Sequence, residues 1–339
     1  MKDMGISYTR VIAMVFILID HIVLTINIPF KSYIIQITNT GVLIFLFISG
    51  FLYGRKEINN FSDWFIKRAK KIILPLYVFI IFLAIFKIIF EGNINIIEYL
   101  KYLINMQGIL GVTHGGVHLW FLTVLMICYL ITPLLEIIKR KNKELKLSRT
   151  IIIIYIYIIV QIFCAYFVNI NFALGHHFST YLIYLLTYII GYYYSYYIKN
   201  KEVNSKKIIF FTLILIISMG IRVISNKLID GTILYNRIIA MYTNIIFAIW
   251  TFVFIKKYYT VINNQFLKKV VNKLNCLSFE IYIVHPLAIE LFMNFTTNNI
   301  INICFTLITI YIIALLFNKI LCCINNMFFI FISKNQKQY

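Results

Sequence analysis

The chain is poor in acidic residues, in charge of any kind and in helix-breaking residues. Only 12 of its 339 residues are Asp or Glu, and charged residues make up 13% of the sequence, roughly half of the share usual in soluble domains. Four prolines and 13 glycines leave little material for long irregular loops. Together with 61% hydrophobic residues and a mean hydropathy of +0.87, this composition excludes a soluble enzyme, a disordered tail and a fibrous repeat protein.

The six cysteines also lack any pattern that carries chemistry. All lie in or beside apolar runs, and none belongs to a CxxC or a Cys/His spacing typical of zinc sites. We therefore expect no disulfide and no metal site, and we interpret the cysteines as small apolar residues of membrane helices.

Apolar stretches of about 20 residues, the length that crosses the hydrocarbon core of a bilayer, dominate the sequence. They predict an all-α, polytopic integral membrane protein with about ten transmembrane helices, forming a single domain over residues 1–339 without a separate soluble domain. The expected spans are 7–28, 36–54, 72–90, 118–138, 150–170, 178–198, 208–225, 236–255, 275–295 and 300–320. No small-residue cleavage site follows the first span, so we expect it to be retained rather than removed as a signal peptide.

The 32 Lys and Arg residues are explained by membrane topology rather than by nucleic-acid binding. All but six lie near the termini or in the segments 55–71, 139–149, 199–207 and 256–273, which alternate with nearly neutral segments. The positive-inside rule then places both termini in the cytoplasm, which requires an even number of spans. Segment 55–71 is amphipathic and predicts an interfacial helix, and the external segment 91–117 is expected to lie on the membrane surface or dip into it.

The first span carries three ionisable residues, which are costly in lipid and therefore candidates for function. Arg10 and His21 are eleven residues apart, so they share one helix face at a separation of roughly 16 Å. Asp20 lies about 100° around the helix from His21. A neutral His21 in a cavity of low dielectric can accept a proton from a hydroxyl. The alternative is a structural His21 bonded to a neighbouring helix, with Arg10 reaching the membrane boundary.

The ninth span contains a second polar cluster in the stretch SFEIYIVHP. Ser278, Tyr282 and His285 are spaced to share one helix face, whereas Glu280 points elsewhere, as a partner for His21 or Arg10. Pro286 loosens the helix next to His285. The alternative is a polar patch that holds helices together.

Two features near the cytoplasmic surface have weaker signals. Ser49 and Gly50 are small enough for close helix packing or for a ligand beside the backbone. Lys67, Arg68 and Lys71 form a basic patch suited to anionic lipid or to a phosphorylated donor.

External histidines offer a third group of candidates. The spacing of His114 and His118 would suit a metal on a helix, but the intervening glycines argue against a helix, and we expect a flexible loop suited to a sugar acceptor. His176 and His177 are expected to be solvated residues at the interface.

These features, in this order, resemble acyltransferase family 3, a family of integral-membrane acyltransferases. The two specific markers are the Arg-x10-His pair and the ninth-span S-x-E-x-Y-x-x-H. The full set of markers is Arg10 with His21, Ser49–Phe51, the basic K-R-x-x-K before Pro75, Trp120–Leu122 with Pro133, and Ser278–His285. The chain departs from the family where a second arginine is usual, since Lys71 stands there and lacks bidentate phosphate geometry.

The resemblance implies transfer of an acyl group, usually acetyl from cytoplasmic acetyl-CoA, to a hydroxyl of an extracytoplasmic glycan. The absence of a fused C-terminal domain resembles the stand-alone branch that acts on surface polysaccharides in the bacterial cytoplasmic membrane. By this reading Lys67, Arg68 and Lys71 attract the donor phosphates, while Arg10 holds the donor or fixes the centre. His21 is the general base, and Glu280, Tyr282 and His285 orient His21 or the acyl carbonyl.

Two other function classes remain open from sequence alone. A transporter of glycan or lipid-linked sugar would use the same buried His and Glu residues for proton coupling or substrate contact. A membrane-anchored sensor or scaffold is a third class, disfavoured because no partner-binding domain is evident.

Overall fold

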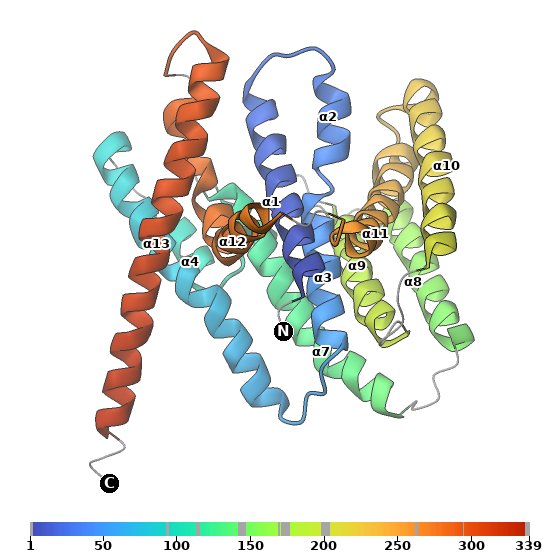
Figure 1. Cartoon of the computed structure of the whole chain (residues 1–339), viewed down its shortest axis with the longest axis horizontal. Helices are drawn as coiled ribbons and strands as arrows, with labels where there is room; N and C mark the ends of the chain where they lie inside the picture. The colour runs from blue at the N-terminus through green and yellow to red at the C-terminus, as the bar shows by residue number, and fades with distance from the viewer. Residues whose placement is uncertain are drawn as a thin grey trace.

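The fold is all-α and polytopic, as the sequence predicts, and every long element is a helix (Figure 1). The computed structural model describes residues 3–92, 95–112, 116–141, 147–168, 170, 177–197, 204–261, 264–293 and 295–335. In the first half of the chain the elements are α1 (Met4–Thr25), α2 (Lys31–Thr38), α3 (Gly41–Gly54), α4 (Phe61–Glu91), α5 (Ile96–Leu103), α6 (Gln107–Leu110), η1 (Val117–Leu119) and α7 (Trp120–Lys141). In the second half they are α8 (Leu147–Phe167), α9 (Phe178–Tyr197), α10 (Ser205–Ile229), the π-helical turn η3 (Leu234–Ile239), α11 (Ala240–Tyr258), α12 (Gln265–Phe292) and α13 (Asn299–Asn335).

Within the described ranges, nine helical segments are long and apolar enough to cross a membrane. They correspond to nine of the ten expected spans, and the remaining expected span, 178–198, is the 20-residue helix α9. The protein is therefore a multi-pass membrane protein.

Two boundaries differ from the expectation. The predicted second span is broken, because α2 and α3 meet at Asn39 and Thr40, and both helices together form one candidate crossing. The predicted interfacial helix in segment 55–71 is wrong. Its second half is instead the start of α4, which continues through Pro75 for 31 residues, about 46 Å, and so outreaches the roughly 30 Å hydrocarbon core.

Helices α3 and α9 form the centre of the core and approach each other through glycine. A Cβ on Gly50 would lie 2.0 Å from the Tyr188 carbonyl oxygen, and one on Gly54 would lie 2.1 Å from that of Tyr192. From the other side, a Cβ on Gly191 would lie 2.2 Å from the Phe47 carbonyl oxygen. Small residues at four-residue spacing allow such close backbone contact in membranes. Of the two roles considered for Gly50, helix packing is the one that the structure supports.

A buried ionic cluster fixes the connection between α3 and α4. Glu136 of α7 is fully buried and accepts hydrogen bonds from Tyr192 (2.6 Å), Lys139 (2.5 Å) and Arg140 (3.0 Å). Lys139 also donates to the carbonyl of Lys56, and Arg140 to that of Ile58. The segment that leads into the basic start of α4 is thereby tied to α7 and, through Tyr192, to α9.

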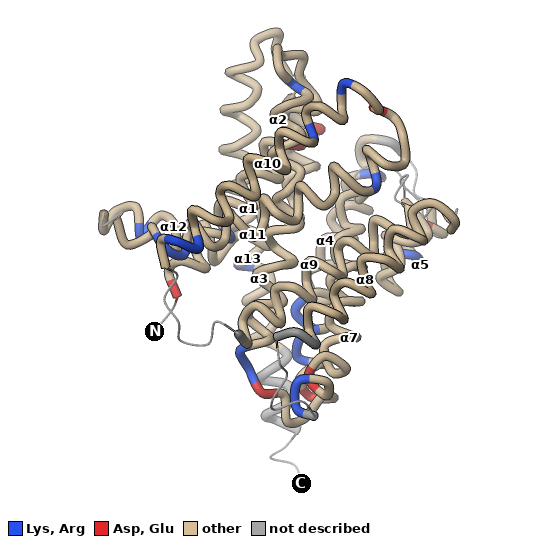
Figure 2. The backbone as a smooth tube through the Cα atoms, turned by 90° about the vertical axis from the view of Figure 1, so that its right-hand side faces the viewer, with Lys and Arg blue, Asp and Glu red and all other residues tan. Residues whose placement is uncertain are grey.

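Lys and Arg gather around the lower end of the molecule and at the start of α12, with isolated positions higher up (Figure 2). The connection from α3 to α4 lies at that lower end, whereas α1 joins α2 and α12 joins α13 at the upper end (Figure 1). The arrangement agrees with the cytoplasmic placement that the charge distribution predicts for the basic connections.

Candidate functional site

Two cavities open inside the helix bundle, and Tyr282 of α12 borders both. The cavity lined by Arg10, Arg68 and Lys71, called the inner cavity, has a volume of about 480 Å³. The cavity lined by Asp20, His21 and Arg237, called the outer cavity, has a volume of about 530 Å³. Cavities of this size are typical of small-molecule sites in membrane bundles.

The inner cavity carries excess positive charge. Arg10 from α1 and the pair Arg68 and Lys71 from α4 line it, against a single carboxylate among its lining residues, Glu280. The Arg68 guanidinium lies over the Tyr53 ring, 5.1 Å from its centroid, and this contact orients it. Three cations facing one cavity suit a ligand with several phosphate groups.

Other polar groups of the inner cavity come from α3 and α12. Ser49, whose neighbour Gly50 packs on α9, lines the cavity. Ser278 and Glu280 both line it as well, although their spacing suggested different directions. The Glu280 Oε2 atom is buried without a hydrogen-bond partner.

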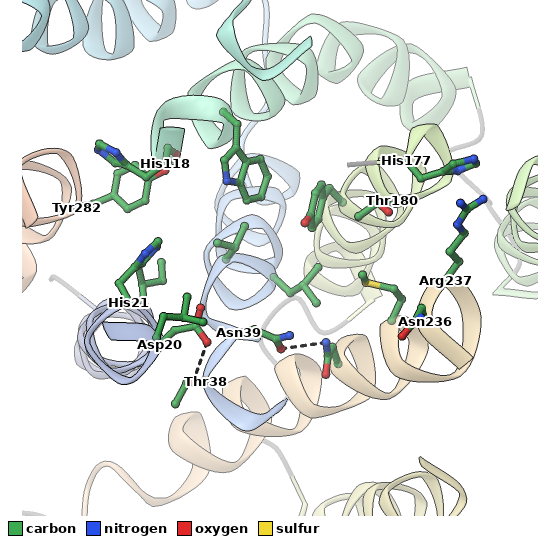
Figure 3. A pocket seen from close by; sticks show the side chains of 18 residues that line it. Asp20, His21, Thr38, Asn39, His118, His177, Thr180, Asn236, Arg237 and Tyr282 are labelled. Carbon is green, nitrogen blue, oxygen red and sulfur yellow. Dashed lines mark hydrogen bonds between the residues drawn. The ribbon is translucent and has the colours of Figure 1, made fainter. Parts of the chain in front are cut away.

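The outer cavity contains the predicted base. His21 and Asp20 line it from α1, and Asp20 accepts a hydrogen bond from Thr38 at 3.0 Å (Figure 3). Arg10 and His21, which the eleven-residue spacing places on one face of α1, therefore face different cavities.

Three imidazole rings meet beside the outer cavity. The ring centroids of His21 and His285 are 4.8 Å apart, and those of His118 and His285 are 5.2 Å apart. His285 is fully buried behind the other two, and its Nε2 atom has no hydrogen-bond partner. His21 of α1 therefore lies next to α12, as expected, but the α12 residue beside it is His285. Glu280, the other candidate partner, lines the inner cavity instead.

The Pro286 ring determines how His285 is held. Proline has no N–H, so the carbonyl of Tyr282, four residues earlier, loses its helical donor. The Nδ1 atom of His285 lies 2.6 Å from that carbonyl oxygen. A carbonyl only accepts, so Nδ1 carries the proton and Nε2 presents a lone pair.

His118 ties η1 to α12. Its Nε2 lies 2.9 Å from the carbonyl oxygen of Ile283, and the Tyr282 hydroxyl donates in return to the backbone carbonyl of His118. His118 is 3% exposed, so the expectation that it sits in a flexible loop is wrong, although it does line the outer cavity. The paired bonds hold its ring against the cluster.

Several sequence-predicted residues lie elsewhere. Lys67 is exposed and lines neither cavity. His177 is 3% exposed rather than solvated, because it packs at the start of α9 and lines the outer cavity. His114 and His176 fall outside the described residues.

Part of the outer cavity is formed by residues that the sequence patterns did not assign to a site. Arg237 in η3, with Trp120 and Tyr184, lines this cavity, and the two aromatic rings stack at 5.0 Å. One signal was available for Arg237, since it is one of only six Lys and Arg residues away from both the basic segments and the termini, and it lies within an apolar run.

A family model described as an acyltransferase domain matches residues 4–325, nearly the whole chain. The comparisons found no curated protein and no solved structure that matches the chain.

Proposed function

The chain belongs to acyltransferase family 3 and is a membrane acyltransferase, and we propose that it moves an acetyl group from cytoplasmic acetyl-CoA to a hydroxyl of an extracytoplasmic glycan. The observation that carries this proposal is the pair of cavities on either side of Tyr282. One has the charge suited to the donor and the other has a base suited to the acceptor.

The donor is proposed to enter the inner cavity from the basic start of α4. Arg68 and Lys71 of α4 attract its phosphates. Arg10 of α1 lines the same cavity and is proposed to contact the donor nearer its acyl group. Lys67 is exposed on α4, so its proposed role is to attract the donor from the membrane surface.

The acceptor is proposed to bind in the outer cavity with its hydroxyl on His21. His21 takes the hydroxyl proton while the oxygen attacks the thioester carbonyl carbon. The new ester bond forms as the carbon–sulfur bond breaks, and CoA leaves as a thiolate that recovers the proton from His21. Because Tyr282 borders both cavities, the thioester and the hydroxyl are proposed to meet beside it.

The remaining polar groups are proposed to position these reactants. His285 presents its Nε2 lone pair near His21 and orients that ring. The position of Glu280 in the inner cavity favours contact with the acyl donor over contact with His21.

The test is transfer by purified protein in lipid nanodiscs, supplied with radiolabelled acetyl-CoA and surface glycans. Wild-type protein is expected to label the glycan without any ion gradient, which a pure transporter would not do. His21→Ala is expected to lose about 10²–10⁴-fold of the rate. If a folded His21→Ala protein labelled the glycan at the wild-type rate, the mechanism would be overturned. If the wild-type protein labelled no glycan with any acyl-CoA tried, the function would be overturned.

A further inference from the structure

The outer cavity has a second polar end, away from His21, that the proposed reaction does not use. His177, Thr180, Asn236 and Arg237 line this end, and Figure 3 shows them across the cavity from His21 and Asp20. They come from the start of α9 and from the π-helical turn η3. Such turns in otherwise α-helical segments are frequent at functional sites.

His177 presents an unused donor at this end. Its Nδ1 atom accepts the backbone N–H of Ser179 at 3.2 Å and lies 2.8 Å from the Ser179 hydroxyl, so the ring proton is on Nε2. Nε2 is buried, and within the described residues it has no partner at full hydrogen-bond geometry, the Val168 backbone giving it only a weak interaction. Burial and the nearby Arg237 charge lower the pKa of His177, against a smaller opposite effect of the Val168 backbone, so the ring is neutral near pH 7.

Arg237 presents a charge that no acidic residue balances at this end. One of its five N–H groups donates to the Ala165 carbonyl at 3.0 Å, and the side chain lines the cavity. Among the described residues around the outer cavity, the single acid is Asp20, which is bonded to Thr38 near His21. The cavity is therefore positive at one end and acidic at the other.

We propose that Arg237 and His177 bind an anionic group, a carboxylate or a phosphate, of the acceptor, so that the acceptor is an acidic glycan. This inference rests on the proposed function for the identity of the acceptor. A guanidinium and a buried N–H together offer the charge-assisted hydrogen bonds that such a group forms. Without an anion the buried Nε2–H donor makes no full hydrogen bond to the described residues, which is costly.

The rest of the cavity fits an acceptor held in this orientation. Trp120 and Tyr184 stack on each other and line the cavity, offering an aromatic surface to the apolar face of a sugar ring. The Arg237 guanidinium attracts an anion to its own end of the cavity, across from Asp20 and His21. The anionic group is therefore directed to Arg237, and a neutral hydroxyl is left for the base.

The experiment compares acceptor oligosaccharides that differ at a single C6 position, bearing a hydroxymethyl, a carboxylate or a phosphate. Wild-type protein is expected to use one of the acidic forms at least about ten-fold better in kcat/KM than the neutral form. Arg237→Gln is expected to remove this preference, so that kcat/KM for the acidic form falls to about that for the neutral form. The control Lys227→Gln removes an exposed positive charge from α10, away from the cavity, and is expected to keep the preference.

A binding measurement separates this inference from the proposed function. Calorimetric titration of each oligosaccharide without donor is expected to give tighter, salt-sensitive binding of the acidic form, weakened by Arg237→Gln. Such binding without acetyl transfer would refute the function and leave the anion site standing. Acetyl transfer with equal use and equal binding of neutral and acidic forms would refute the anion site alone. If Arg237→Gln does not fold, two other measurements test the anion site. Arg237→Lys is expected to weaken binding of the acidic form, and added salt is expected to weaken its binding to the wild-type protein; no effect of either would refute the site.

Discussion

The imidazole of His285 takes the place of a backbone N–H on the carbonyl of Tyr282, with Nδ1 2.6 Å from the oxygen. The bond exists because Pro286 cannot donate to that carbonyl. A break in the regular helix thus becomes the support that fixes the ring and tautomer of a buried histidine. Its Nε2 has no hydrogen-bond partner among the described residues, and its ring centroid lies 4.8 Å from that of His21.

Replacing Pro286 by Ala is expected to separate stability from activity. The new N–H competes with His285 for the Tyr282 carbonyl, so the ring loses its fixed position, and kcat is expected to fall about ten-fold. Stability is expected to stay level or to rise, since Pro in a helix interior costs about 3 kcal/mol. Thermal unfolding and acetyl transfer measure the two effects. Pro29→Ala, in the exposed turn after α1, is the control, and an unchanged kcat in Pro286→Ala would contradict the role of His285.

Arg68 and Lys71 are expected to act on donor affinity. Arg68→Gln is expected to raise the KM for acetyl-CoA about ten-fold with a smaller change in kcat, because the side chain lines the inner cavity. Lys71→Arg is expected to lower that KM, since a guanidinium contacts phosphate through two parallel bonds. Steady-state kinetics with varied donor measure both. Lys70→Gln is the control on the exposed side of α4, and an equal rise in KM there would assign the effect to general surface charge.

The contact between α3 and α9 is expected to tolerate no side chain at Gly50. A Cβ there meets the Tyr188 backbone at 2.0 Å, so Gly50→Ala is expected to destabilise the protein by about 1–3 kcal/mol or more. Gly220→Ala in α10 is the matched control, because nothing lies within 4 Å of its Cβ position, and it is expected to stabilise by about 0.5–1 kcal/mol. Unfolding in detergent measures both, and similar results for the two variants would disprove the glycine-mediated contact.

Glu136 is expected to hold the α3–α4 connection through charge. Glu136→Gln leaves Lys139 buried without its carboxylate partner, and breaking a buried pair in this way costs about 3–5 kcal/mol. Glu57→Gln, at an exposed position of the same connection, is expected to change stability little. The double variant Glu136→Gln/Lys139→Gln is expected to recover part of the loss, and no recovery in chemical unfolding would argue against the ion pair.

The sequence was sufficient for the helices and for the polar residues that α1, α4 and α12 bring together. Apolar length locates helices, and the cost of charge in lipid marks residues such as Arg10 and His21. These signals are local, so they do not depend on which helices become neighbours.

The far wall of the outer cavity was not predictable in the same way. His177 and Arg237 are 60 positions apart and meet only because α9 and η3 pack on the same cavity. Helix order within a bundle depends on side-chain fit, as at Gly50 and Gly191, and hydropathy does not encode it. The same limit applies to Glu280, whose spacing gives its direction on α12 but not the cavity that it faces.

Helix α9 has the length of a membrane span without the hydropathy of the nine candidate spans in the described residues. Its sequence is rich in tyrosine, and it falls outside the helices that are apolar enough to be recognised as spans in the described part of the chain. A topology built only on the nine candidate spans of the described residues has an odd number of crossings and reverses the orientation of α10 to α13 relative to the ten expected spans. The residues of α11 and α12 would then run across the membrane in the opposite order to the α1 and α4 residues that line the same cavities.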